Sequence, residues 1–184
     1  MLTNNWTTKT SVCSWIGVTC NHYRVTELDI SDMGLVGTIS PEIGNLSSLV
    51  SLNIMGNFFH GYVPPSIFNM SSLEIISATN NSLSGRLAGD MCSHGVGRVV
   101  KVIDLSYNEL YGEIPSSLEQ CSQLEMIALF MNKFSGRVPR EIGNITGLTA
   151  LFLSFNDLDG KCVYIYYLAF LLIDNTALYI ILVD

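Results

Sequence analysis

Three histidines and a glycine-rich segment are the features of this sequence that come nearest to catalytic or cofactor-binding chemistry. The segment from Gly95 to Val100 imitates a nucleotide-binding loop, but it lacks the third glycine and leads into a predicted strand rather than a helix. The histidines are isolated, with no nucleophile or carboxylate at a motif spacing: His22, His60 and His94. We therefore expect no enzymatic activity and no cofactor.

Cysteine spacing indicates a disulfide rather than a metal site. Cys13 and Cys20 lie seven positions apart in Cys13-Ser-Trp15-Ile-Gly17-Val-Thr-Cys20, and a bond between them can close a small loop. The five cysteines form no Cys-x-x-Cys or Cys/His pattern, so we expect no zinc or other metal.

Asparagines in Asn-x-Ser/Thr sequences are candidate glycosylation sites, although each pattern alone is a weak signal. Asn45, Asn69 and Asn144 share one repeat position at the entry to the convex return, so they could instead reflect a need for polar turn residues. We favour glycosylation, because the predicted disulfide indicates the same secretory compartment. The full set is Asn5, Asn45, Asn69, Asn80 and Asn144.

Composition narrows the class of protein further. The chain has 184 residues, of which 48% are hydrophobic and 14% charged, which predicts one folded domain rather than a disordered segment. A net charge of −7 argues against nucleic-acid binding, which needs a field of basic residues. No segment matches the H-R-D, D-F-G or V-A-I-K motifs of protein kinases.

Internal repeats organise the chain. The segments Leu49–Pro64 and Leu124–Pro139 share the template L-x-x-L-x-L-x-x-N-x-L-x-G-x-I-P, and four more copies bring the total to six. The period is that of a leucine-rich repeat, which predicts a right-handed α/β-type solenoid with short parallel strands on its concave face. The template asparagines are spaced 24, 27, 24 and 24 residues apart: Asn57, Asn81, Asn108, Asn132 and Asn156.

Side-chain direction gives each copy a physical interpretation. In Leu52-Asn53-Ile54, alternation places the two aliphatic residues inward and the middle residue outward, as in one strand of a sheet. The template asparagine turns inward, where its amide must bond the backbone groups of neighbouring coils. We therefore expect a ladder of buried asparagines along the stack.

Departures from the template are confined to a few positions. Met33 replaces the asparagine of the first copy, which is tolerable where a coil abuts a cap. Cys121 falls on a core site held by Leu46 and Met70 in other copies, so we expect a small buried hydrophobic residue there. Cys92 and Cys162 have no partner in the template, and their separation in the repeat frame argues against a bond between them.

The C-x-W-x-G-V-x-C segment and the repeats that follow it resemble the extracellular region of plant leucine-rich-repeat receptor-like kinases. The segment from Asp29 to Ile39 is similar to the corresponding sequence in the subfamily that senses microbial patterns. The resemblance implies a cap over residues 1–24, six repeats over 25–160, and an extracellular module that binds peptides, proteins or a leucine-rich-repeat co-receptor. Plant polygalacturonase-inhibiting proteins share the repeat type, so a secreted inhibitor is the alternative.

Both ends depart from that family. Residues 161–184 are apolar, show no seventh strand in frame, and would gain little from crossing a membrane because Asp174 lies near the middle. Truncation or read-through is the favoured interpretation, with a β-hairpin through Asp174-Asn-Thr176 as its structural variant. Residues 1–5 contain no hydrophobic signal segment. A non-functional receptor fragment therefore also stays open.

The outward positions of the concave sheet change from acidic in the first coil to apolar in the last two. Exposed aromatic residues and methionines on adjacent strands are typical of a binding surface. The alternative is that this end stacks against further repeats or the tail. Ser106 and Ala128 are also predicted to face outward. The candidate ligand-binding residues are Tyr107, Met126, Phe130, Met131, Phe152 and Phe155.

Overall fold

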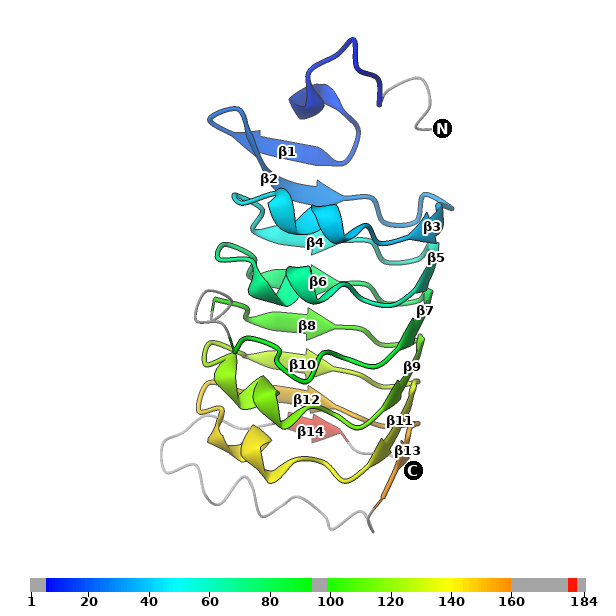
Figure 1. Cartoon of the computed structure of the whole chain (residues 1–184), viewed down its shortest axis with the longest axis vertical. Coiled ribbons are helices and arrows are strands. Elements are labelled where there is room, and N and C mark those ends of the chain that lie inside the picture. Colours follow the sequence, from blue (N-terminus) through cyan, green and yellow to red (C-terminus); the bar gives the residue numbers. More distant parts are fainter. Residues whose placement is uncertain (1–5, 94–98, 160–178, 182–184) are drawn as a thin grey trace.

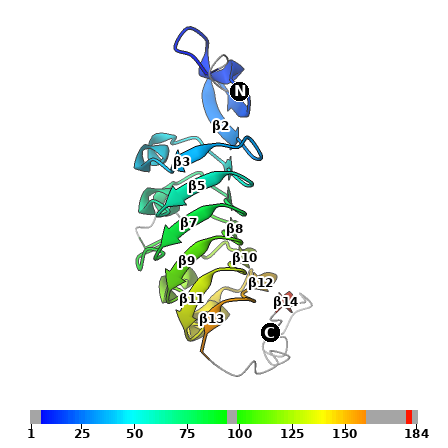
Figure 2. The ribbon, with the colours of Figure 1, turned by 90° about the vertical axis from the view of Figure 1, so that its right-hand side faces the viewer.

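The structure, a computed structural model, describes residues 6–93, 99–159 and 179–181. Successive coils stack along one axis and form two sheets on different sides of the stack, in which the strands of the repeats run parallel (Figures 1 and 2). This arrangement confirms the predicted leucine-rich-repeat solenoid with short parallel strands. We number the coils 1 to 6 by their first strands, which are β2, β4, β6, β8, β10 and β12.

The concave sheet holds eight strands within the described residues. β1 (Val18–Asn21) pairs antiparallel with β2 (Arg24–Asp29), and each later strand is parallel to the one before it. The later strands are β4 (Ser51–Asn53), β6 (Ile75–Ser77), β8 (Val102–Asp104), β10 (Met126–Ala128), β12 (Ala150–Phe152) and β14 (Tyr179–Ile181).

A second parallel sheet, which the sequence analysis did not predict, lines the adjacent side of the stack. Its strands lie in the x-Leu-x-Gly part of each repeat, which follows the template asparagine (Figure 2). Its strands are β3 (Val36–Thr38), β5 (Phe58–Gly61), β7 (Ser82–Gly85), β9 (Glu109–Gly112), β11 (Lys133–Gly136) and β13 (Asp157–Leu158).

Short 3-10 helices form the convex side of coils 1, 2, 4 and 5. Each begins at or next to a proline, which cannot continue a strand and suits the first turn of a helix. Coil 3 carries Leu87-Ala88 in place of Ile-Pro, and residues 89–93 form turns instead. The helices are η3 (Pro41–Asn45), η4 (Pro65–Asn69), η5 (Ser116–Gln120) and η6 (Arg140–Asn144); η2 (Val12–Ser14) lies in the cap.

The core is a set of aliphatic columns running through the stack. The central residues of the concave strands lie in register and are buried: Leu52, Ile76, Ile103, Ile127 and Leu151. Phe68 and Phe134 are also fully enclosed. Because each coil covers the face that its neighbour cannot bury alone, the stack is the folding unit.

Two expectations from the sequence are wrong. Cys121 is buried as predicted, but it is not a lone residue: it forms a disulfide with Cys92, with Cα atoms 5.3 Å apart. The two residues are 29 positions apart, about one repeat, so stacking brings them together on the convex side. The tail also supplies a seventh strand in the stack, because β14 pairs in parallel with β12. Cys162 and the predicted hairpin turn at 174–176 lie outside the described residues.

Candidate functional site

The asparagine ladder joins each coil to the one before it. Asn132 donates from Nδ2 to the carbonyls of Leu129 and Phe130 in its own coil and to Leu105 in the preceding coil, at 3.0–3.4 Å. Its Oδ1 accepts the backbone N–H of Leu110, also in the preceding coil. Asn57, Asn81, Asn108 and Asn156 repeat this pattern. Met33 in coil 1 needs no such amide, because no repeat precedes it.

Immediately before each ladder position the backbone adopts the left-handed conformation. We call these six residues the left-handed column: Asp32, Gly56, Asn80, Tyr107, Met131 and Phe155, with φ between 53° and 67°. Hydrogen bonds between coils hold this geometry: the N–H of Tyr107 donates to the carbonyl of Phe130, and the carbonyl of Tyr107 accepts from the N–H of Asn81. The repeat therefore sets the backbone conformation, whichever side chain occupies the position.

Coils 4 to 6 carry the apolar surface predicted from the sequence. Tyr107, Met131 and Phe155 of the left-handed column are 45%, 40% and 59% exposed. The ring of Tyr107 packs edge-on against that of Phe130, with centroids 4.8 Å apart. Met126 and Phe152 lie half-buried on β10 and β12. We call these six residues the apolar patch.

The structure adds Ile75 and Val102 to this surface. They share the outward row of Met126, since the register pairs Ile75 with Val102 and Val102 with Met126. Each is the first residue of a three-residue strand whose middle residue points inward, so alternation in the sequence is enough to place the row outward.

Two positions predicted to face outward, Ser106 and Ala128, are buried instead. Ala128 pairs in register with the much larger Phe152 of the next coil, whose side chain can shield it from water. The prediction is therefore wrong for these two residues.

Coil 1 presents an acidic surface at the other end of the concave sheet. Glu27, Asp29 and Asp32 are exposed there. The hydroxyl of Ser31 donates to Asp29 at 2.7 Å and holds the pKa of that carboxyl below its usual value, assisted by the Ser31 N–H and by Asn53. Within the described part of the chain, no ion pair neutralises these three carboxylates.

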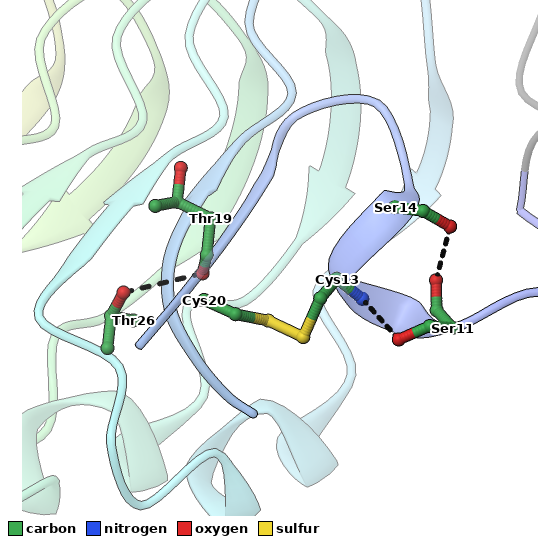
Figure 3. Close-up of a disulfide and its surroundings, with 6 residues drawn as sticks. All are labelled: Ser11, Cys13, Ser14, Thr19, Cys20 and Thr26. Atoms are coloured by element: carbon green, nitrogen blue, oxygen red, sulfur yellow. Dashed lines mark hydrogen bonds between the residues drawn. A yellow bond between two sulfur atoms is a disulfide. The ribbon is translucent and has the colours of Figure 1, made fainter. Parts of the chain in front are cut away.

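The cap closes the N-terminal edge of the concave sheet. Cys13 and Cys20 are joined by a disulfide with Cα atoms 5.5 Å apart, which ties η2 to β1 (Figure 3). Trp6 and Trp15 stack at 5.1 Å, and Trp6 donates from Nε1 to the carbonyl of Ile16. A side chain at Gly17 would overlap the carbonyl of Asp29, so only glycine fits there.

The sequon asparagines lie in two places. Asn45, Asn69 and Asn144 are exposed at the last residues of η3, η4 and η6, on the convex side. The sequence had placed them at the entry to the convex return, whereas the helices begin four residues earlier. Asn80 is exposed within the left-handed column, on the patch side of the molecule. Asn5 lies outside the described residues.

The other features of the structure give less evidence for a functional site. Among the described side chains, no group of three or more His, Cys, Asp or Glu residues is arranged to hold a metal ion. No helix in the described ranges is long and apolar enough to cross a membrane. The histidine and glycine-loop positions from 94 to 98 lie outside those ranges. Four exposed apolar side chains that the sequence did not predict lie on or beside the second sheet: Val36, Phe58, Tyr62 and Tyr111.

Comparison with known proteins agrees with this architecture. A family model described as Leucine Rich Repeat matches residues 100–121. Phytosulfokine receptor 1 of Arabidopsis thaliana is 31% identical over 173 residues, which cover 80% of this chain but 17% of the receptor. The chain thus spans less than a fifth of that relative's length.

Solved ectodomains superpose on most of the chain. A pollen receptor kinase 3 structure is 34% identical with a TM-score of 0.74, over 85% of this chain and 76% of that one. The ectodomain of the Arabidopsis receptor kinase HAESA, in complex with an IDA peptide hormone, is 30% identical with a TM-score of 0.74, over 82% of this chain and 25% of that one. From its repeats, its fold and these similarities, the chain belongs to the leucine-rich-repeat family of plant receptor-like kinase ectodomains.

Proposed function

We propose that this chain is a non-catalytic recognition module that binds an extracellular peptide or protein through the apolar patch. The observation that carries the proposal is the exposure of Tyr107, Met131 and Phe155 on three adjacent coils. Large contiguous apolar patches are rare on monomeric proteins, and those that occur mark interaction sites. The solved HAESA ectodomain, which has the same repeat fold, binds a peptide hormone.

Charge and position support a ligand lying on the concave side. The apolar patch occupies the last three coils, while three exposed carboxylates occupy the first, so the concave surface changes in character along the stack. Three of the four described sequons lie on the convex side, where glycans would leave the concave sheet open. We propose that Asn45, Asn69 and Asn144 carry N-linked glycans. We also propose that the protein acts outside the cell. A leucine-rich-repeat co-receptor is a further partner of the same class.

The test is a binding selection followed by substitution in the patch. A display library of unstructured dodecapeptides is selected on the full chain, and the peptides recovered are titrated against wild type and Phe130→Ser/Phe152→Ser. We expect the double variant to lose roughly tenfold or more in affinity, since aromatic residues at an interface centre often dominate binding. Circular dichroism controls for folding.

The same selection can reject the proposal. Peptides that bind wild type and the double variant equally would place recognition elsewhere on the molecule. Inhibition of a polygalacturonase without any selectable peptide would instead favour the secreted inhibitor.

A further inference from the structure

The left-handed column changes composition halfway along the stack. Coils 1 to 3 use Asp32, Gly56 and Asn80, residue types that adopt positive φ readily. Coils 4 to 6 use Tyr107, Met131 and Phe155 in the same conformation. Bulky side chains are unfavourable there because Cβ crowds the following carbonyl oxygen.

These three residues are only partly covered by the rest of the molecule. Each is at least 40% exposed, and only Tyr107 has a described ring contact, with Phe130. Strained residues persist where the surrounding structure fixes the backbone, and they cluster at binding sites. Here the inter-coil hydrogen bonds fix the backbone, and the side chains are directed to solvent. Their chemistry therefore points to a ligand rather than to folding.

The acidic end sets the second requirement for that ligand. Glu27 and Asp29 lie on β2, and Asp32 follows them in the left-handed column. The outward residues of coils 2 and 3 are mainly small or uncharged, such as Ser51 and Ser77, whereas Asp104 on β8 adds one half-buried carboxylate beside the apolar patch. A ligand crossing the strands thus meets three exposed carboxylates at one end and mainly apolar side chains at the other.

Strand spacing fixes the distance between these two ends. β2 and β12 are separated by five inter-strand steps in the concave sheet. At about 4.8 Å for each step this is roughly 24 Å, which an extended peptide spans in about seven residues.

We propose that Tyr107, Met131 and Phe155 are specificity-determining residues, kept at a cost to fold stability, for an extended peptide with an apolar end and a basic end. The apolar end lies on coils 4 to 6, and a Lys or Arg about seven residues away meets Glu27, Asp29 and Asp32. This inference rests on the proposed function and identifies the class of peptide.

The first experiment reads the sequence pattern of peptides selected on the full chain. We expect recovered dodecapeptides to place an aromatic or aliphatic residue about five to eight positions from a Lys or Arg. Selected peptides that depend on Phe130 and Phe152 but show no such spacing would overturn this inference and leave the proposed function standing. Failure to recover any peptide that needs the patch would overturn both.

The second experiment separates binding from folding. Met131→Asn/Phe155→Asn places a residue tolerant of positive φ at both positions, so we expect the thermal midpoint to rise by about 2 °C or more. The same variant should lose roughly tenfold in affinity for the selected peptides. Opposite changes in stability and affinity are the signature of residues retained for binding.

A matched control removes similar apolar area without relieving strain. Met126→Asn/Phe152→Asn changes two strand residues with ordinary backbone geometry, so affinity should fall while the thermal midpoint does not rise. If the left-handed double variant is less stable than wild type, or binds the selected peptides equally well, the assignment of Met131 and Phe155 is wrong.

Discussion

Coils 1 to 3 and coils 4 to 6 share one backbone but present different surfaces. Both halves have the asparagine ladder, the two parallel sheets and a left-handed residue before each ladder position. The first half fills that position with Asp32, Gly56 and Asn80, and the second half with Tyr107, Met131 and Phe155. Since the left-handed residue donates its N–H to the next coil in both halves, the surface can change without changing the fold.

Stability and recognition are therefore carried by different positions of the repeat. Stability comes from inward aliphatic columns and ladder amides, which recur along the stack. Recognition is assigned to outward positions, which differ from coil to coil. Replacing a ladder asparagine should lower stability by a similar amount in both halves. In the left-handed column, adding a bulky side chain in coils 1 to 3 should lower stability, whereas removing one in coils 4 to 6 should raise it.

The ladder should show the largest effect. Asn132→Leu or Asn108→Leu leaves several buried backbone groups unpaired, at about 1–3 kcal/mol for each group. Asn57→Leu in the first half should cost a similar amount. Asn53→Leu, on the half-exposed concave surface, should cost far less. Chemical unfolding midpoints compare the four variants, and equal shifts for Asn53→Leu and Asn132→Leu would refute the assigned roles.

The two disulfides should contribute different amounts to stability, because they enclose different lengths of chain. In the chain-entropy model, the Cys92–Cys121 bond contributes about 3.6 kcal/mol and the Cys13–Cys20 bond about 2.4 kcal/mol. We therefore expect Cys92→Ala/Cys121→Ala to lower stability more than Cys13→Ala/Cys20→Ala. Mass mapping of the wild type should recover both pairs, and free thiols at Cys92 and Cys121 would contradict the structure.

Moving a bulky residue into the first half tests the left-handed column directly. Asn80→Phe should lower stability by about 1–2 kcal/mol, because the new side chain is held at positive φ. Ser77→Phe, on the adjacent strand with ordinary geometry, is the control and should be nearly neutral. A neutral result for Asn80→Phe would show that this backbone imposes no strain on a bulky residue.

The smallest expected effect is a pH dependence in coil 1. The pKa of Asp29 is lowered, chiefly by the Ser31 hydroxyl, so its ionised form stabilises the folded state. That contribution is present above the unfolded value of about 3.9 and is lost as pH falls through the lower folded pKa. Ser31→Ala should therefore lower stability slightly at about pH 7 and not at about pH 2. An equal decrease at both pH values would contradict this cause.

Much of the fold could be predicted because the same pattern of apolar residues and asparagine recurs in each repeat. Period-two alternation around Leu52 and the recurring asparagines are enough to predict strands and inward amides. The second sheet was missed because its strands run through the Leu-x-Gly part of the template, which resembles a turn sequence. Pairing of Cys92 with Cys121 was missed because contacts between coils depend on the repeat register, and coil 3 departs from it.

The candidate site was predictable in part. Alternation placed Met126 and Phe152 outward, but it also placed Ser106 and Ala128 there, since it takes no account of how large neighbours shield small residues. The conformation of Tyr107 could not be inferred from its residue type, which disfavours positive φ. A single signal pointed to it, namely that Asp32, Gly56 and Asn80 hold the same repeat position.

Photo-crosslinking of a selected peptide reports both where the ligand lies and in which direction it runs. The peptide is synthesised twice, with a photoreactive phenylalanine analogue at its apolar end or beside its basic residue, and the adducts are mapped by mass spectrometry. We predict labelling of residues 126–131 and 150–155 from the apolar end, and of residues 24–32 from the basic end. Labelling of one region from both ends, or labelling confined to the second sheet or the convex side, would contradict a ligand that crosses the concave strands.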